Sequence, residues 1–142
     1  MEAAKNTLNE VAIVAPSHID IYWDQVKELL RPAVDLNDGY ELEDVHNYLR
    51  MGEQMLWIYR GEGRIYAAMV VEVLKYPRKN TVMVLFVGGE KFEEWKHFFG
   101  QLKAYAKMVG AADIEGIGRP GWTRALGADD VQAFFRFKVQ GE

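Results

Sequence analysis

Cysteine is absent from this sequence, and histidine occurs only three times. Without cysteine the chain has no disulfide, no thiolate nucleophile and no sulfur ligand for zinc, and it suits a reducing compartment such as the cytoplasm. His18, His46 and His97 lie on separate segments without a short metal-ligand spacing, which is typical of surface or helix-edge histidines. We therefore expect no metal site.

Long apolar runs and an excess of positive charge are also missing. No run approaches the roughly 20 residues that span a bilayer, and residues 1–10 lack the apolar core of an export signal. The net charge of -4 disfavours a protein that neutralises many phosphates. These absences predict a cytoplasmic protein without a membrane or nucleic-acid partner.

What is present is the composition of an ordinary globular domain. The chain has 142 residues, of which 49% are hydrophobic and 27% charged, enough apolar surface for one core. No repeat, low-complexity stretch or linker divides it. We expect a single domain over residues 1–142, with 1–10 as a flexible N-terminal segment.

The first predicted elements are a strand and a helix. Residues 11–15 form a short β-branched run that stops at Pro16, which indicates either a strand or an extended N-terminal segment. Ser17, followed by Asp20, resembles a capping box, and the apolar residues after it recur at helical spacing. This helix is expected to end before Pro32, because proline disfavours helical geometry in the residue that precedes it.

A second helix and three strands follow. Residues 42–49 place their apolar side chains on one helical face, and Gly52 is a natural terminator. Residues 55–59, 65–76 and 81–87 are apolar runs separated by short turns. They predict three consecutive antiparallel strands, the last two central in the sheet.

The remaining chain predicts two helices and two strands. The apolar spacing over residues 92–109 is the strongest helical signal, and 114–117 indicate a short strand. Residues 120–126 predict a brief helix, and the alternation over 131–139 predicts a last strand. The expected fold is therefore α/β (α+β): a mixed, mostly antiparallel sheet of about six strands flanked by about four helices.

Two glycine-rich stretches have the spacing of phosphate sites. Residues 116–121 match the dinucleotide pattern G-x-G-x-x-G, but the further βα unit that this motif needs has no room before the chain ends, so we interpret them as a turn. Gly88 and Gly89 lie between a buried strand and a helix start, where backbone amides can hold an anion. Lys91 favours this, whereas neighbouring glutamates at 90, 93 and 94 oppose it, and both readings stay open.

Three residues are candidates for acid–base chemistry. Glu72 lies inside an apolar strand and Glu115 inside a short one, so either carboxylate is a candidate base if it is half-buried. Tyr76 is a candidate proton donor. Since strand side chains alternate, each carboxylate can equally face solvent.

A turn near the C-terminus carries Arg119, Trp122 and Arg124. Two guanidinium groups beside an indole can bind an anion, a planar ring or a partner protein. The plain alternative is an exposed arginine pair beside a packed tryptophan.

The element order resembles the GNAT (N-acetyltransferase) fold over almost the whole chain. The sequence is most similar to short GNAT-type proteins of tailed bacteriophages, through residues 40–45, 76–79 and 114–122. The resemblance implies an acetyl-CoA site in a cleft beside the strand that ends at Val87. The residues it implies as cofactor contacts are Leu85, Phe86 and Val87 for pantetheine, and Gly88, Gly89 and Lys91 for the phosphates.

The sequence departs from that family at two places. Residues 88–92 replace its usual phosphate loop, and Trp122, Phe134 and Phe135 occupy the region where a tyrosine commonly protonates the leaving thiolate. Two functions therefore stay open. One is acyl transfer from acetyl-CoA to an unidentified amine; the other is a catalytically inactive scaffold that serves phage assembly or binds a host or virion protein in the host cytoplasm.

Overall fold

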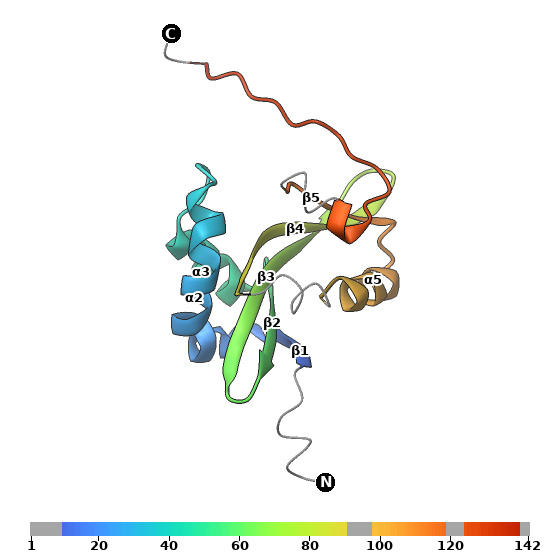
Figure 1. Cartoon of the computed structure of the whole chain (residues 1–142). Coiled ribbons are helices and arrows are strands. Elements are labelled where there is room, and N and C mark those ends of the chain that lie inside the picture. The colour runs from blue at the N-terminus through green and yellow to red at the C-terminus, as the bar shows by residue number, and fades with distance from the viewer. Residues whose placement is uncertain (1–9, 91–97, 119–123, 140–142) are drawn as a thin grey trace.

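A computed structural model describes residues 10–90, 98–118 and 124–139 of the chain. Within them, one sheet lies between a layer of two helices and a layer containing a third (Figure 1). The elements in chain order are β1 (Glu10–Val14), the 3-10 turn η1 (Pro16–His18), α2 (Ile19–Asp35), α3 (Leu42–Met51), β2 (Met55–Gly61), β3 (Arg64–Lys75), β4 (Asn80–Gly89), α5 (Phe98–Met108) and β5 (Asp113–Gly116).

The strands lie in sequence order across the sheet, β1-β2-β3-β4-β5. Neighbours are antiparallel except β4 and β5, which are parallel because the connection through α5 crosses over the sheet. The predicted mixed, mostly antiparallel sheet is confirmed. The described part of the chain has five strands rather than about six.

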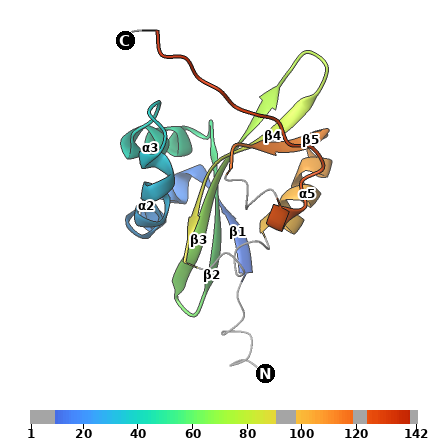
Figure 2. The ribbon, with the colours of Figure 1, turned by 45° about the horizontal axis from the view of Figure 1, so that its top comes forward.

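Each face of the sheet has its own core. On one face, α2 and α3 bury residues such as Val26, Leu30 and Leu49 against Val70 of β3. On the other face, α5 buries Phe98 and Leu102 against the opposite side chains of β2, β3 and β4. Figure 2 shows α2 and α3 on the opposite side of the sheet from α5. The nearly continuous apolar sequence of β3 follows from this arrangement, because helices cover both faces of the strand.

The first helix differs from its prediction at both ends. Pro16 starts a 3-10 turn, α2 begins at Ile19, and no side chain caps either start, so Ser17 is not the cap that we expected. The helix also continues through Pro32 to Asp35. Proline removes one backbone hydrogen bond, but Val34, on the turn after it, is buried, and this burial favours continuing the helix.

The predicted last strand over residues 131–139 is wrong. These residues make no sheet pairing, and Val131, Phe135 and Val139 are 65%, 77% and 99% exposed. In both views the segment leaves the domain beyond β5 and runs toward the side of α2 and α3 (Figures 1 and 2). An alternating pattern specifies a strand only where a sheet edge pairs with it, and this segment does not lie on one.

Two further predictions fall partly outside the described residues. Of the long helix, α5 covers Phe98–Met108, and residues 91–97 are not described. Of the brief helix over 120–126, only residues 124–126 are described, and they are helical. Among the described residues, no helix has the length and apolarity to cross a membrane.

Candidate functional site

The most distinctive feature of the sheet is the point where β4 and β5 part. β5 pairs with Thr81–Val84 and no further. On its other side β4 pairs with β3 as far as Gly89, but the register skips Leu85, because Phe86 opposes Val70 and Val84 opposes Val71. Leu85 is therefore a β-bulge, and such bulges bend the strand and redirect its groups. Among the described residues, Phe86–Gly89 have a strand neighbour on one side only.

Gly88 brings this part of β4 against α2. A Cβ atom at Gly88 would lie 1.8 Å from the carbonyl oxygen of Leu29, so only glycine permits this contact. The α2 face of β4 is closed here by the helix backbone. This face of Gly88 therefore has no room for a ligand.

The first acidic residue after β4 contacts β3. The Glu90 carboxylate forms an ion pair with Arg64, whose guanidinium lies 4.7 Å from the centre of the Tyr66 ring. The backbone N–H of Glu90 donates to the carbonyl of Tyr66. The negative charge of Glu90 is thus compensated, while Lys91 and the start of the predicted long helix lie outside the described residues.

The two candidate carboxylates share one row of the sheet. Glu72 of β3 is opposite Met83 of β4, and Met83 is opposite Glu115 of β5. Side chains opposite one another project from the same face, which here is the face of α2 and α3 because Val70 belongs to that core. Both carboxylates are half-buried. Met83, the residue between them, lies two positions before the Leu85 bulge on β4.

The surroundings of the two carboxylates differ. The Lys79 ammonium lies 2.6 Å from an oxygen of Asp113 and 3.6 Å from one of Glu115. The Asp113 carboxylate, which also accepts from the Thr81 hydroxyl, raises the pKa of Lys79. Among the described residues, no side chain bonds or pairs with Glu72. Glu72 is therefore the carboxylate available to a ligand.

Of the other predicted site residues, only some can be located. Tyr76 is 44% exposed at the turn between β3 and β4, where its N–H donates to the Lys79 carbonyl, so it lies outside the row of Glu72 and Glu115. Arg124 is exposed in the helical turn 124–126. Arg119 and Trp122 are outside the described residues, and their turn stays a prediction.

The structure adds a groove that the sequence did not indicate. It lies where α2 leads into α3, with a volume of about 330 Å³ open to solvent. It is lined by Arg31, Asp35, Asn37, Tyr40, Glu41, Leu42 and Glu43. The ring of Tyr40 meets Phe86 edge-on, with 5.4 Å between ring centres. This contact sets the groove beside the part of β4 that follows the bulge.

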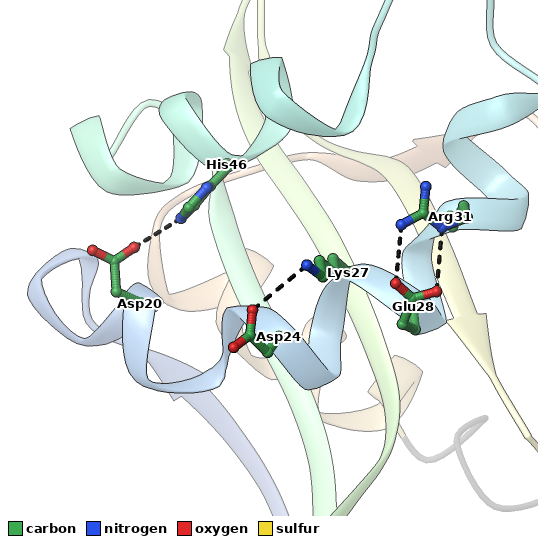
Figure 3. A network of polar contacts seen from close by, with 6 residues as sticks. All are labelled: Asp20, Asp24, Lys27, Glu28, Arg31 and His46. Carbon is green, nitrogen blue, oxygen red and sulfur yellow. Dashed lines mark hydrogen bonds and ion pairs between the residues drawn. The ribbon is translucent and has the colours of Figure 1, made fainter.

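The charge of the groove is mainly negative. Asp35, Glu41 and Glu43 supply carboxylates, whereas its one cation, Arg31, is already paired with Glu28 at 2.9 Å (Figure 3). A signal in the sequence was present in hindsight: the loop between the two helices is rich in acidic residues. Its position beside β4 depends on the tertiary fold, which no local pattern encodes.

Polar contacts also join α2 to α3. The Asp20 carboxylate accepts from Arg50 at 2.9 Å and lies 2.7 Å from Nε2 of His46, as Figure 3 shows for the histidine. The His46 ring stacks on Trp23, with 4.3 Å between ring centres. This is a helix-edge histidine as predicted, and the described residues contain no group of side chains suited to a metal ion.

The described sheet has one parallel pair, β4 and β5, and this pair separates after Val84. No protein-family model matches the chain, and none of the curated proteins is similar to it in sequence. Solved structures are similar in fold, and on this basis the chain has the GNAT fold that its element order predicted.

Three solved structures illustrate the similarity. The aminoglycoside acetyltransferase meta-AAC0020 from an uncultured soil metagenomic sample, in complex with sisomicin, aligns with a TM-score of 0.70 and 11% identity over 93% of this chain and 97% of that chain. Aminoglycoside N-acetyltransferase AAC(6')-Iy in complex with CoA aligns with 0.68 and 11% over 95% and 97%. A predicted acetyltransferase with acetyl-CoA from Clostridium acetobutylicum aligns with 0.65 and 13% over 93% and 97%.

Proposed function

We propose that this protein is a GNAT-type N-acyltransferase that transfers the acetyl group of acetyl-CoA to an amine. The observation that carries the proposal is the separation of β4 from β5 at the Leu85 bulge, with a half-buried carboxylate two positions before it. Proteins of the same fold have been solved with CoA and with acetyl-CoA.

The free edge of β4 suits the cofactor. Backbone groups of Leu85, Phe86 and Val87 lie along an edge that β5 does not cover, and an amide-containing pantetheine arm can pair with such an edge as a short strand does. Gly89 is exposed just beyond, and Lys91 adds the positive charge that phosphates require. Acetyl-CoA would supply an activated thioester carbonyl.

Glu72 is our candidate for the general base. It would accept a proton from the amine nitrogen while the C–N bond forms and the C–S bond breaks, and the thiolate would take a proton from solvent. Glu115 is the weaker candidate, because Lys79 lies near its carboxylate. Tyr76, exposed at the turn, is less suited than water to protonate the thiolate.

The acidic groove suggests the class of acceptor. Its carboxylates Asp35, Glu41 and Glu43 would attract a positively charged amine and raise its local concentration. The contact between Tyr40 and Phe86 connects the groove to the strand that carries the bulge. We therefore propose a small cationic amine rather than an anionic or neutral acceptor.

Calorimetric titration with acetyl-CoA tests the binding step. We expect a one-to-one complex, and adenosine serves as a control that lacks the pantetheine arm. Absence of heat at millimolar acetyl-CoA would remove the transferase proposal and leave the fold untouched.

Substitution of the two carboxylates tests the chemistry. Glu72→Gln should lower kcat by about 100-fold or more, the usual contribution of a general base, with the affinity for acetyl-CoA unchanged. Glu115→Gln is the matched control on the other side of Met83, and its kcat should change far less. Release of CoA in the presence of a panel of cationic amines gives the rate; equal effects of the two substitutions would contradict the role of Glu72.

A second function is favoured by one observation, the exposed apolar segment over residues 131–139. A catalytically inactive GNAT scaffold, encoded by a phage and binding a virion or host protein, would use such a surface. Recovery of the protein with purified virions, together with no acetyl-CoA binding, would support this alternative, and acetylation by virion-free protein would count against it.

A further inference from the structure

Arg64, at the start of β3, carries a guanidinium group that rests on aromatic side chains. The guanidinium lies 4.7 Å from the centre of the Tyr66 ring, and Tyr66 packs on the core beneath α5. The Tyr66 ring is 6.2 Å from that of the buried Tyr59, which is 6.3 Å from the ring of Phe98 in α5. A guanidinium stacked on a ring still directs its N–H groups outward in its own plane. Arg64 therefore presents an oriented cation on the α5 side of the sheet.

The present partner of Arg64 is easily replaced. The guanidinium pairs with Glu90, and the two side chains are 51% and 46% exposed. Exposed ion pairs change an equilibrium constant by less than about 5-fold. The backbone of Glu90 is held separately, because its N–H donates to the Tyr66 carbonyl. The Glu90 side chain can thus turn away from Arg64 without any change in the sheet.

The position of this ion pair favours an anionic ligand. Glu90 follows Gly89, which is the last residue of β4, is exposed and lies opposite Ala67 of β3. The sequence Gly88, Gly89, Glu90 has no positive side chain of its own. Among the described residues, the cation that contacts this end of β4 comes from the neighbouring strand, as Arg64.

Phosphate suits the Arg64 guanidinium better than a carboxylate does. The planar guanidinium binds both anions with the same two-point geometry. A phosphate monoester, however, has three acceptor oxygens and roughly -1.5 to -2 charges at neutral pH, whereas a carboxylate has one charge. A phosphate group is therefore a stronger partner for Arg64 than Glu90 is.

We propose that Arg64 is a phosphate-binding residue for acetyl-CoA and that Glu90 is a competitor built into the chain. In the free protein Glu90 holds the guanidinium; when acetyl-CoA binds, one of its phosphates takes that place and the Glu90 carboxylate turns to solvent. The inference rests on the proposed function, which supplies the phosphate ligand. It assigns the positive charge to β3, outside the loop in which the family resemblance implied the phosphate contacts.

Calorimetric titration of three variants with acetyl-CoA tests the exchange. Arg64→Gln should raise the Kd about 10-fold or more, because a hydrogen bond to a charged group is lost. Glu90→Gln should lower the Kd about 3-fold, because the competing carboxylate is removed. Arg78→Gln removes the same charge at the exposed turn between β3 and β4, at the other end of both strands, and should leave the Kd unchanged.

Two further measurements separate a phosphate contact from a structural role. The midpoint of urea denaturation should fall by similar small amounts in Arg64→Gln and Glu90→Gln, since both substitutions break the same ion pair, whereas their effects on the Kd are opposite. S-acetylpantetheine has the thioester but no phosphate, and it should bind the natural protein and Arg64→Gln equally.

The results that would overturn the role of Arg64 differ from those that would overturn acyl transfer. If the natural protein and Arg64→Gln bind acetyl-CoA equally well, the role of Arg64 is wrong and the transferase proposal stands. The same holds if Glu90→Gln binds acetyl-CoA more weakly, or if Arg64→Gln loses the same factor with S-acetylpantetheine. A natural protein that does not bind acetyl-CoA contradicts both proposals.

Discussion

At the scale of single residues, the packing of α2 on β4 depends on Gly88, which has no side chain. Gly88 allows the backbone of β4 to touch the backbone of α2, and the neighbour that a Cβ would meet is the Leu29 carbonyl oxygen. A backbone atom in a packed helix cannot rotate away as a side chain does. The family resemblance implied a phosphate contact at this residue, which stays a prediction, and the structure gives the residue a packing role.

Alanine substitution at two glycines should therefore have opposite effects. Gly88→Ala should lower the free energy of unfolding by about 2 kcal/mol or more, because α2 must move off the sheet. Gly100→Ala, in α5 with no atom near the added Cβ, should raise it by about 0.5–1 kcal/mol through helix propensity. Urea denaturation measures both. A neutral Gly88→Ala would mean that α2 and β4 do not approach this closely.

At the scale of elements, α2 and α3 are joined by apolar packing and by the Asp20 cluster. The hydrogen bond from Arg50, followed by the contact with His46, lowers the pKa of Asp20 below its ordinary value. A carboxyl group whose pKa is lower in the folded state stabilises the protein above its unfolded pKa, and this contribution is lost as the pH falls through the folded value. The contribution of Asp20 to the link between the helices is thus fully present at neutral pH and is lost in acid.

The pH dependence of one variant tests this link. Asp20→Asn should lower the Tm at pH 7, and the difference from the natural protein should shrink as the pH falls below roughly 4 and vanish only below the lowered pKa of the folded state, where the carboxyl is protonated in both states. Asp24→Asn is the control, since Asp24 contacts only Lys27 on its own helix, at 3.6 Å. Scanning calorimetry from pH 7 to acid measures both, and equal Tm changes at pH 7 would argue against the link.

The sequence predicted those elements whose own pattern decides their structure. β3 and β4 are apolar over a full strand length, and α3 has an acidic capping box and Gly52 in the left-handed region at φ 76°, so local signals suffice. Three features escaped because tertiary contacts decide them. These are the continuation of α2 past Pro32, the absence of a strand over residues 131–139, and the groove beside Tyr40. Glu72 and Glu115 were candidates from the sequence, but their common row required the strand register.

At the scale of the whole molecule, the sheet is unevenly supported. Thr81–Val84 have strands on both sides, while Phe86–Gly89 have a described strand partner only in β3. Amides of the first group should therefore exchange hydrogen more slowly than those of the second, because opening them breaks more pairing. Exchange measured by NMR along β4 checks this, with β3 as the uniformly protected reference. Uniform protection along β4 would show that other segments cover the edge.

The backbone contact between Gly88 and Leu29 also has a mechanical consequence. It holds the Phe86–Gly89 part of β4 against α2, so that these two elements move together. If the gap between β4 and β5 widens to admit the proposed thioester, the movement has to come from β5 and α5. Backbone motion should therefore be larger on the α5 side of the domain.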